Sequence, residues 1–335
     1  MDGTRQRRTQ YASPPGRLEL SRIRPLVQRV LNWQVLRPSR LDVVVFGESF
    51  WDWTLNLGPQ APVWRRLGAV GSVVLAADDW RAPSLPWLAA RGRLVIPLLE
   101  CNIEAMAPVD CWGLFPSRRA VEILADKAKF ERYAVRRGLA HLVPPSFGSP
   151  AEVTYPCVVK RTNLQGGHGV AVAETPQELA THLAAEGIAG HPVVLQRLLE
   201  GPDITVHAVV VAGRLRWHRA YEHVYDRAKP IHRPGPDEPT RTVRLSQRDI
   251  EDLESFLVPL SYEGPVNFDM KRGGDGRVRV LEINPRIGGS LFRAHNLDDL
   301  TAAMTTLIRY ARWHGGLRGL RGRAPGAGHP TATTA

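Results

Sequence analysis

Apolar and polar residues alternate along two neighbouring segments of the chain, residues 266–271 and residues 281–284. Successive side chains on a β-strand point to opposite faces, so the alternation predicts two strands that each have one apolar and one polar face. A glycine-rich turn separates the segments and indicates an antiparallel hairpin. The polar face of this hairpin gathers three oxygen-bearing side chains, those of Asp269, Glu282 and Asn284.

These three side chains have the chemistry of a Mg²⁺ or Mn²⁺ site. Both ions prefer carboxylate and carbonyl oxygen, and they complete their coordination with water and phosphate. Neither Cys nor His occurs in the two segments. Taken alone, the hairpin leaves a second interpretation open, in which Asp269 and Glu282 only form the solvated face of an edge hairpin.

Apolar runs nearer the N-terminus predict a different kind of sheet. Residues 42–47, 71–76 and 93–97 are short and mostly apolar, as are the strands of a parallel sheet that is buried on both faces. The first run ends in a single glycine and lacks a G-x-G-x-x-G fingerprint, so dinucleotide binding is not supported. Residues 18–36 carry apolar side chains at helical spacing and predict an amphipathic helix on the body, with membrane contact as a weaker alternative.

The rest of the pattern predicts a mixture of helices and strands. Residues 117–137 predict one continuous helix that ends at Gly138. Further along, residues 204–211 predict a strand, residues 217–241 a long polar loop, and residues 247–261 a helix.

Between these parts, a glycine-rich loop joins two predicted strands, residues 155–160 and 170–173. Lys160 ends the first strand, and the loop of residues 162–169 follows it. An ammonium group beside several backbone N–H groups is a suitable arrangement for phosphate oxygens. The spacing is not that of a Walker loop, and taken alone a glycine-rich hairpin is also compatible with a purely structural role.

Composition limits the class of protein. The chain has 335 residues with 43% hydrophobic content, enough for two or three compact units. No apolar run approaches the roughly 20 residues of a membrane span, and the N-terminus lacks the apolar core of a secretion signal. The three cysteines lack metal-ligand spacing and fit a reducing compartment. We therefore expect a soluble, cytoplasmic protein.

The formal net charge of +11 comes from the two ends of the chain. Residues 1–40 carry a net charge of +7 and residues 309–335 a net charge of +5, so the body between them is close to neutral. Basic tails are more often solvated segments than segments that recognise specific DNA or RNA sequences, and no nucleic-acid recognition motif accompanies them. Nucleic-acid binding is therefore not expected.

Positively charged residues are mostly arginine, and the chain has only five lysines. Each lysine is therefore a more informative candidate for a functional role.

An ordered set of motifs over residues 41–314 resembles the ATP-grasp superfamily. The set comprises Asp126-Lys127, Val159-Lys160, the glycine loop, Gln196 to Leu199, Glu200-Gly201-Pro202-Asp203, Asn267-Phe268-Asp269 and Glu282-Ile283-Asn284-Pro285-Arg286. The resemblance implies an α+β / α/β fold, with an N-terminal parallel-sheet pre-ATP-grasp domain followed by two lobes that hold ATP between their sheets. The boundaries that we assign are 1–40 for a basic tail with an amphipathic helix, 41–116 for the pre-ATP-grasp domain, 117–195 for the small lobe or lid, 196–314 for the C-terminal lobe, and 315–335 for a disordered tail.

The resemblance also implies roles for individual residues. Lys127 and Lys160 resemble the lysines that contact ATP, and Asp269, Glu282 and Asn284 match the metal-binding trio, with Glu282 bridging two ions. Further nucleotide-binding positions are the loop glycines Gly166, Gly167 and Gly169, the adenine-binding segment Gln196, Arg197, Leu198 and Leu199, and the ribose-binding Asp203. Gln196 and Asp203 replace residues that are more often Glu in the family.

The implied chemistry is activation of a carboxylate as an acyl phosphate, which an amine then attacks. We expect an ATP-dependent carboxylate–amine ligase for amino acids or small peptides, with ATP and two Mg²⁺ or Mn²⁺ ions. Arg286, Lys229 and Ser290 are the expected catalytic residues. The alternatives are a carboxylase, a kinase-type phosphotransferase and a nucleotide-binding protein without turnover. The expected partners are small-molecule carboxylates and amines, and a homodimer is compatible with the sequence.

Overall fold

The structure is a computed structural model that describes residues 41–47, 57–68, 70–76, 93–106, 112–162, 164, 168–225 and 238–321. The chain divides into two compact units, Met1–Pro38 and Ser39–Ala335, and the described residues all belong to the second. The helix expected over residues 18–36 lies outside the described residues, as does the expected tail from residue 322 onward. No helix among the described residues is long and apolar enough to cross a membrane.

The three N-terminal apolar runs form the parallel sheet that their pattern predicts. Strand β1 (Leu41–Phe46) lies between β2 (Val70–Ala76) and β3 (Leu94–Pro97), and both pairings are parallel. Helices α3 (Pro62–Leu67) and α5 (Glu100–Met106) accompany the sheet. Helix α5 starts three residues after β3 ends, which brings its N-terminal Glu100 to the carboxyl edge of this sheet.

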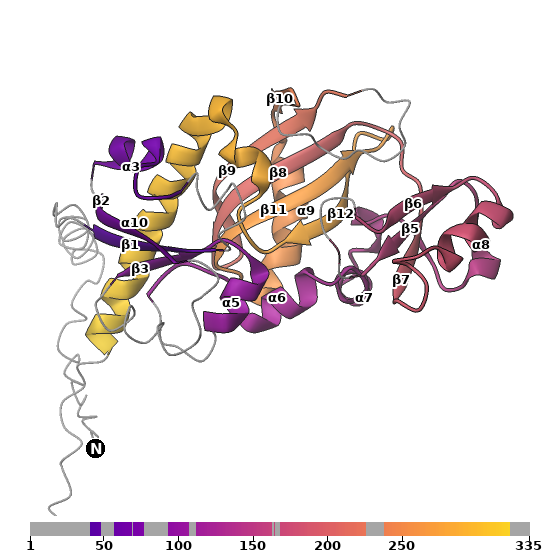
Figure 1. The fold of residues 1–335 in the computed structure, drawn as a ribbon, viewed down its shortest axis with the longest axis horizontal. Helices are drawn as coiled ribbons and strands as arrows, with labels where there is room; N and C mark the ends of the chain where they lie inside the picture. Colours follow the sequence, from indigo (N-terminus) through magenta and orange to yellow (C-terminus); the bar gives the residue numbers. More distant parts are fainter. Residues whose placement is uncertain are drawn as a thin grey trace, which may run out of the picture. The chain divides into compact units, whose positions relative to one another are not determined.

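A five-stranded antiparallel sheet forms the largest element (Figure 1). The strand order is β10-β9-β8-β11-β12, and the bounds are Thr240–Val243, Arg214–His223, Asp203–Val211, Gly264–Arg272 and Val278–Asn284. The hairpin of β11 and β12 confirms the predicted antiparallel pair. Two elements differ from prediction, because β9 runs on to His223 and β10 begins at Thr240, both within the segment expected to be a loop.

One face of this sheet is apolar and covered by helices. Val206, Phe268 and Ile283 are completely or almost completely buried in its core. Helices α6 (Arg118–Leu124), α7 (Lys127–Arg136) and α9 (Gln247–Leu257) contribute to the same core or lie against it. Short 3-10 helices follow in the chain at Ala140–Leu142, Pro150–Glu152, Val258–Leu260, Gly289–Phe292 and Ala294–Asn296.

The predicted single helix of residues 117–137 is in fact the pair α6 and α7. Asp126 breaks it, because its side chain accepts a hydrogen bond from the backbone N–H of Lys129 and so caps the start of α7. Gly138 ends α7 with a φ of 74°, as predicted. Since both helices pack in the core of the five-stranded sheet, residues 118–143 are structurally part of that lobe and not of the lid.

A second, four-stranded sheet forms the lid-like part. Its order is β4-β7-β5-β6, with bounds Ser146–Phe147, Val193–Arg197, Cys157–Arg161 and Val170–Ala173. Helix α8 (Pro176–Ala184) packs on one face through Leu179, and the opposite face carries Lys160.

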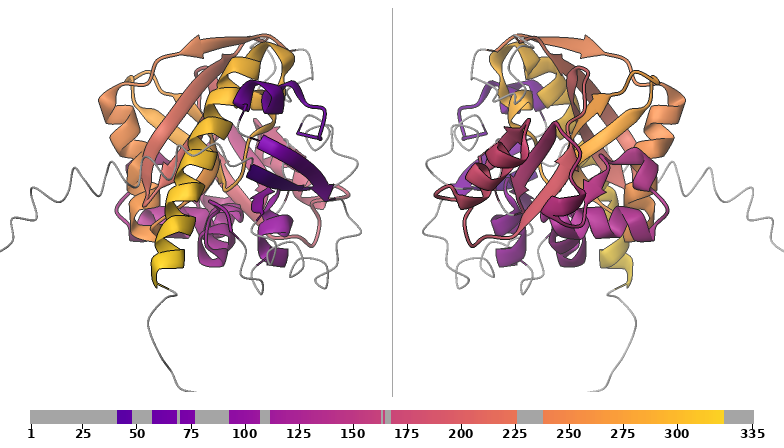
Figure 2. Two further views of the ribbon diagram at one scale, coloured as in Figure 1. Left: turned by 90° about the vertical axis from the view of Figure 1, so that its left-hand side faces the viewer. Right: turned by 90° about the vertical axis from the view of Figure 1, so that its right-hand side faces the viewer.

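Helix α10 (Leu297–Arg321) joins the N-terminal sheet to the five-stranded sheet. Leu300, Met304 and Leu307 share one core with β1, β3 and residues of β8 and β9. The two views of Figure 2 show α10 on one side of this unit and the four-stranded sheet on the other. Residues 315–321, which we expected to be disordered, are helical. The segment extends a helix that is already nucleated, and no Pro interrupts it, although Gly315, Gly316 and Gly319 have low helix propensity.

Candidate nucleotide and metal site

The three predicted metal ligands meet on the polar face of the β11–β12 hairpin. Asp269 pairs directly with Glu282 across the two strands. The Asn284 amide nitrogen, Nδ2, donates to Asp269 Oδ2 at 3.1 Å and to Glu282 Oε1 at 3.2 Å. One point in space therefore lies within hydrogen-bonding distance of both carboxylates.

The Asn284 NH₂ group stands where a cation would be, because it is the positive end of a dipole between two carboxylates. Rotating the amide by 180° would turn its oxygen toward the same point, and the two orientations are chosen by the hydrogen-bond network. Two carboxylates and one amide oxygen fit Mg²⁺ or Mn²⁺, which take further water and phosphate oxygens. Among the described residues, no group of three or more His, Cys, Asp and Glu side chains forms another candidate metal site.

Two donors hold Asp269 from behind. The Thr205 hydroxyl donates to Asp269 Oδ1 at 2.9 Å, and the Asn267 amide donates to the same oxygen at 3.2 Å. Both donors bind Oδ1, so Oδ2 is left facing Asn284 and Glu282. Asp269 is thus oriented before any cation binds.

Lys127 reaches the metal trio from the start of α7. Its ammonium lies 3.0 Å from Glu282 Oε2 and donates to the carbonyl of Leu164 at 2.5 Å. The backbone N–H of Lys127 donates to the carbonyl of Thr162, at the end of β5. The first turn of α7 therefore ties the lid-like sheet to the carboxylates of the five-stranded sheet.

The charges in this site shift one another. Burial lowers the pKa of Lys160 to about 8, and the nearby Glu282 carboxylate opposes that shift. Burial and the facing Glu282 raise the pKa of Asp269. Burial also disfavours ionised Glu282, but Lys127 and Lys160 outweigh it and lower the pKa of that carboxyl. The ionised Glu282 between two lysines gives the site an alternating pattern of charge, suited to bind phosphate and a cation together.

The residues expected to bind the base and ribose are less open than the sequence suggests. Gln196 is buried and its amide donates to Ser146 Oγ at 3.3 Å. The backbone N–H groups of Arg197 and Leu198 already donate to other carbonyls, and Leu199 follows them in the chain. Asp203 pairs with Lys271 at 2.8 Å and accepts a hydrogen bond from Tyr225.

Of the expected loop and catalytic residues, some lie within the described part of the chain and others outside it. Gly169 has a φ of 65° and closes the turn before β6, whereas Gly166, Gly167 and Lys229 lie outside the described residues. Ser290 Oγ lies 2.8 Å from His207 Nε2. Burial lowers the pKa of His207 to about 3, so this imidazole is neutral at pH 7.

Arg286 does not project into solvent. Its Nε lies 3.2 Å from both carboxylate oxygens of Glu100, the first residue of α5. The side chain is buried, and it also donates to the carbonyl of Ile287. The guanidinium is therefore fixed just after β12, the strand of Glu282 and Asn284, by a residue of the N-terminal sheet region.

Sequence reasoning assigned no role to several side chains of this face. Thr205 and His207 lie on β8, and Lys271 on β11, on the same face as Asp269. Period-two alternation along β8 places Thr205 and His207 on the face of Asp203, but it does not show where the polar part of that face ends and the core begins.

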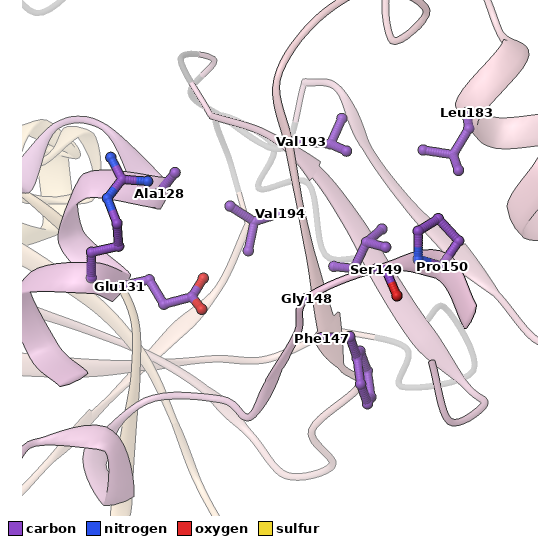
Figure 3. Close-up of a pocket in the computed structure, with 11 residues that line it drawn as sticks. Ala128, Glu131, Phe147, Gly148, Ser149, Pro150, Leu183, Val193 and Val194 are labelled. Carbon is purple, nitrogen blue, oxygen red and sulfur yellow. The ribbon is translucent and has the colours of Figure 1, made fainter. Parts of the chain in front are cut away.

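A cavity of about 260 Å³ lies between α7 and the four-stranded sheet (Figure 3). Glu131 projects from α7 on one side, and Ser149, Pro150 and Leu183 line the other. Val194, which also lines it, pairs directly with Lys160. Neither Lys160 nor the metal trio lines this cavity.

Three solved structures resemble this chain over most of its length. They are the L-amino acid ligase from Bacillus licheniformis (15% identity, 80% of this chain and 74% of that one, TM-score 0.55), D-alanine–D-alanine ligase from Bacillus anthracis in complex with ATP (13%, 85% and 99%, TM-score 0.60), and biotin carboxylase from Campylobacter jejuni (15%, 86% and 68%, TM-score 0.54). This chain has the ATP-grasp fold. The ATP-grasp architecture expected from the motifs is thereby confirmed.

Sequence similarity covers less of this chain. The large chain of carbamoyl phosphate synthase from Thermotoga neapolitana is 26% identical over 186 residues, which are 51% of this chain and 16% of that protein. The chain thus spans a small part of the length of the curated relatives that it matches. No family model matches it.

Proposed function

We propose that this protein is an ATP-dependent carboxylate–amine ligase that joins amino acids or small peptides and releases ADP and phosphate. The observation that carries the proposal is the contact of Lys127 with the Glu282 carboxylate. It brings a side chain suited to phosphate together with two acidic residues suited to Mg²⁺, across two parts of the fold.

In this proposal the nucleotide lies between the lid and the five-stranded sheet. Lys127 and Lys160 contact its phosphates, and the glycine loop that ends at Gly169 covers them. Gln196 and the backbone up to Leu199 hold the adenine. Asp203 holds the ribose once its carboxylate exchanges part of its present hydrogen bonding with Tyr225 and Lys271.

Asp269, Glu282 and Asn284 would hold Mg²⁺ or Mn²⁺, and two ions would share Glu282. When bound, the ions would neutralise the negative charge that develops on the transferred phosphoryl group. The chain's own contribution is to fix these oxygens before binding, through Thr205 and Asn267.

The two steps of the reaction are standard for an acyl phosphate. An oxygen of the substrate carboxylate attacks the γ-phosphorus of ATP, and ADP leaves. The amine then attacks the acyl carbon, phosphate leaves, and an amide forms. Arg286, held by Glu100, would grip the carboxylate or acyl phosphate in its planar fork. Lys229 would contact phosphate, and Ser290 would face the amine.

The experiment is an assay of ADP and phosphate release from purified protein with ATP, Mg²⁺ and pairs of amino acids, with mass spectrometry of the products. The proposal predicts ADP, phosphate and an amide in equal amounts for at least one pair. Release of ADP with a phosphorylated product and no free phosphate would replace it with a kinase-type reaction. Tight ATP binding without ADP for any pair would replace it with nucleotide binding alone.

One of the three structures described above is named a carboxylase, so bicarbonate belongs in the same assay as an alternative to the amine reaction. A carboxylated product that forms only with bicarbonate would favour that alternative. We expect the amide reaction instead, and we expect the protein to be cytoplasmic. Its oligomeric state can be measured on the same preparation.

A further inference from the structure

A chain of three hydrogen bonds leads from the edge of the five-stranded sheet to Asp269. His223 Nδ1 lies 3.2 Å from Glu238 Oε1, and His223 Nε2 lies 3.0 Å from Thr205 Oγ1. Thr205 Oγ1 in turn donates to Asp269 Oδ1 at 2.9 Å. His223 and Thr205 are buried, with exposed fractions of 6% and 7%, so bulk water does not compete strongly for these bonds.

The direction of each bond follows from the number of protons. Thr205 has one hydroxyl proton, and it is given to Asp269. The bond between Thr205 and His223 must then be donated by His223 Nε2. The Glu238 carboxylate only accepts, so Nδ1 donates to it. Both ring nitrogens therefore act as donors, which requires the protonated imidazolium form of His223, and these three bonds each point toward an acceptor.

We propose that His223 is a positioning residue, which fixes the Thr205 hydroxyl and through it orients Asp269 for metal. The inference rests on the proposed metal site. A hydroxyl rotates freely unless something occupies its lone pairs, and the His223 donor removes that freedom. Asp269 Oδ1 then stays bound to Thr205, and Oδ2 stays directed at Glu282 and Asn284.

Glu238 holds the imidazole in turn and is itself anchored. The backbone carbonyl of Glu238 accepts a hydrogen bond from Arg293 Nη1 at 2.5 Å. Glu238 lies just before β10. The edge strand of the sheet therefore helps to set the geometry of Asp269, three hydrogen bonds away from Glu238. Such supporting contacts typically change metal affinity about 10- to 100-fold.

The test compares two amides that replace different nitrogens of the ring. The Gln side-chain nitrogen lies near the position of His Nε2, and the Asn nitrogen near that of Nδ1. His223→Gln therefore keeps the donor to Thr205, and His223→Asn keeps only the donor to Glu238. Mn²⁺ affinity is measured by electron paramagnetic resonance with a non-hydrolysable ATP analogue, which needs no turnover. His218→Gln, on the same strand, is the matched control.

We expect His223→Asn to weaken Mn²⁺ binding about tenfold, with His223→Gln and His218→Gln close to the wild type. Equal losses in His223→Gln and His223→Asn, or no loss in either, would overturn the positioning role. Absence of Mn²⁺ binding by the wild-type protein would overturn the proposed metal site as well, so the two failures are distinguishable.

A second set of variants guards against misfolding at His223. Thr205→Ser keeps the hydroxyl and should retain Mn²⁺ affinity, whereas Thr205→Val, of the same shape, should lose about as much as His223→Asn. If both residues act through one chain of bonds, the double variant His223→Asn/Thr205→Val loses no more than either single variant. Additive losses would mean that His223 does not act through Thr205.

Discussion

At the scale of single residues, the decisive feature is the pairing of Asp269 with Glu282. Two carboxylates directly opposite each other on neighbouring strands repel, and a solvated hairpin face has no reason to keep them together. Here the Asn284 amide lies between the two carboxylates, and the Lys127 ammonium contacts that of Glu282. That arrangement favours a cation site over the edge-hairpin interpretation.

Glu282→Gln should abolish turnover while leaving nucleotide binding largely intact. The amide keeps the size of the side chain but removes the negative charge that would hold the ions, and the positive charge of those ions beside the phosphoryl group matters most in the transition state. ADP release and the ATP dissociation constant are measured side by side. The exposed Glu186→Gln is the control, and wild-type turnover in a folded Glu282→Gln protein would contradict the assignment.

Lys160 gives a pH dependence whose sign can be worked out. Its pKa in the nucleotide-free protein is lowered to about 8, so the ammonium is lost as pH rises through that value. Bound phosphate favours the charged form, so binding above that pH requires proton uptake. ATP affinity should fall up to tenfold per pH unit from about pH 8 to about pH 9.5.

The measurement is the ATP dissociation constant across that range. Lys160→Arg should bind with little pH dependence, because guanidinium stays charged. Lys129→Arg, at an exposed position of α7, should behave as the wild type. An unchanged affinity of the wild-type protein over the whole range would show that Lys160 does not contact the phosphates.

Sequence alternation was sufficient to predict that Asp269, Glu282 and Asn284 meet on one face, because the period of a strand is local and the three residues lie on one hairpin. Thr205 and His207 were missed for a physical reason. Later residues on the same face of β8 are buried valines, so this face changes from site to core within one strand, which a sequence pattern does not reveal.

At the scale of elements, the turn after β12 is built on close backbone approach. A Cβ on Gly288 would lie 2.4 Å from Asn267 Oδ1 and 2.5 Å from His207 Cε1. Real Cβ atoms do not approach so closely, so the chain passes over these buried polar groups only because residue 288 has no side chain. This passage also sets where Ser290 meets His207.

Gly288→Ala should therefore destabilise the protein by about 1–3 kcal/mol and reduce turnover, because the segment must move away from the site. Gly274→Ala is the matched control, since nothing lies within 4 Å of its added Cβ. Urea unfolding and ADP release are the measurements. Equal stability of the two variants would mean that the segment adjusts without strain.

Elements with a strong local signal were predicted and those without one were not. The parallel strands and the hairpin have continuous or alternating apolar residues. The break between α6 and α7 has neither Gly nor Pro, and Asp126 acts only through its cap. Strand β10 has two exposed residues among its four and pairs on one side only, so it needs no apolar run.

At the scale of the whole molecule, a buried ion pair joins the N-terminal sheet region to the segment that follows β12. Glu100 and Arg286 have side-chain exposed fractions of only 11% and 6%. Removing one partner breaks this ion pair and leaves the other charge buried, which typically costs about 3–5 kcal/mol. The same region shares an apolar core with α10 and the five-stranded sheet.

Glu100→Ala should lower the free energy of unfolding by about 3–5 kcal/mol. The double variant Glu100→Ala/Arg286→Ala should lose less than the sum of the two single variants, because it leaves neither charge of this pair buried. Urea unfolding measures all three, with the exposed Glu186→Ala as control. Additive losses would mean that the pair does not couple the two regions.

The sequence predicted the order of the parts better than their association. Motifs identify the ATP-grasp fold, but residues 118–143 were assigned to the lid although they pack on the five-stranded sheet. Packing partners depend on contacts between distant segments, such as Tyr133 with Phe256, and no local pattern encodes these.

The central claim is that Asp269, Glu282 and Asn284 bind divalent ions that hold the phosphates of ATP. A crystal structure with Mn²⁺ and a non-hydrolysable ATP analogue tests it directly, because the anomalous signal of manganese locates the metal. We predict at least one peak between these three side chains, with a phosphate oxygen in its coordination sphere and Lys160 beside the phosphates. A nucleotide bound elsewhere, or manganese bound without Glu282, would contradict the account.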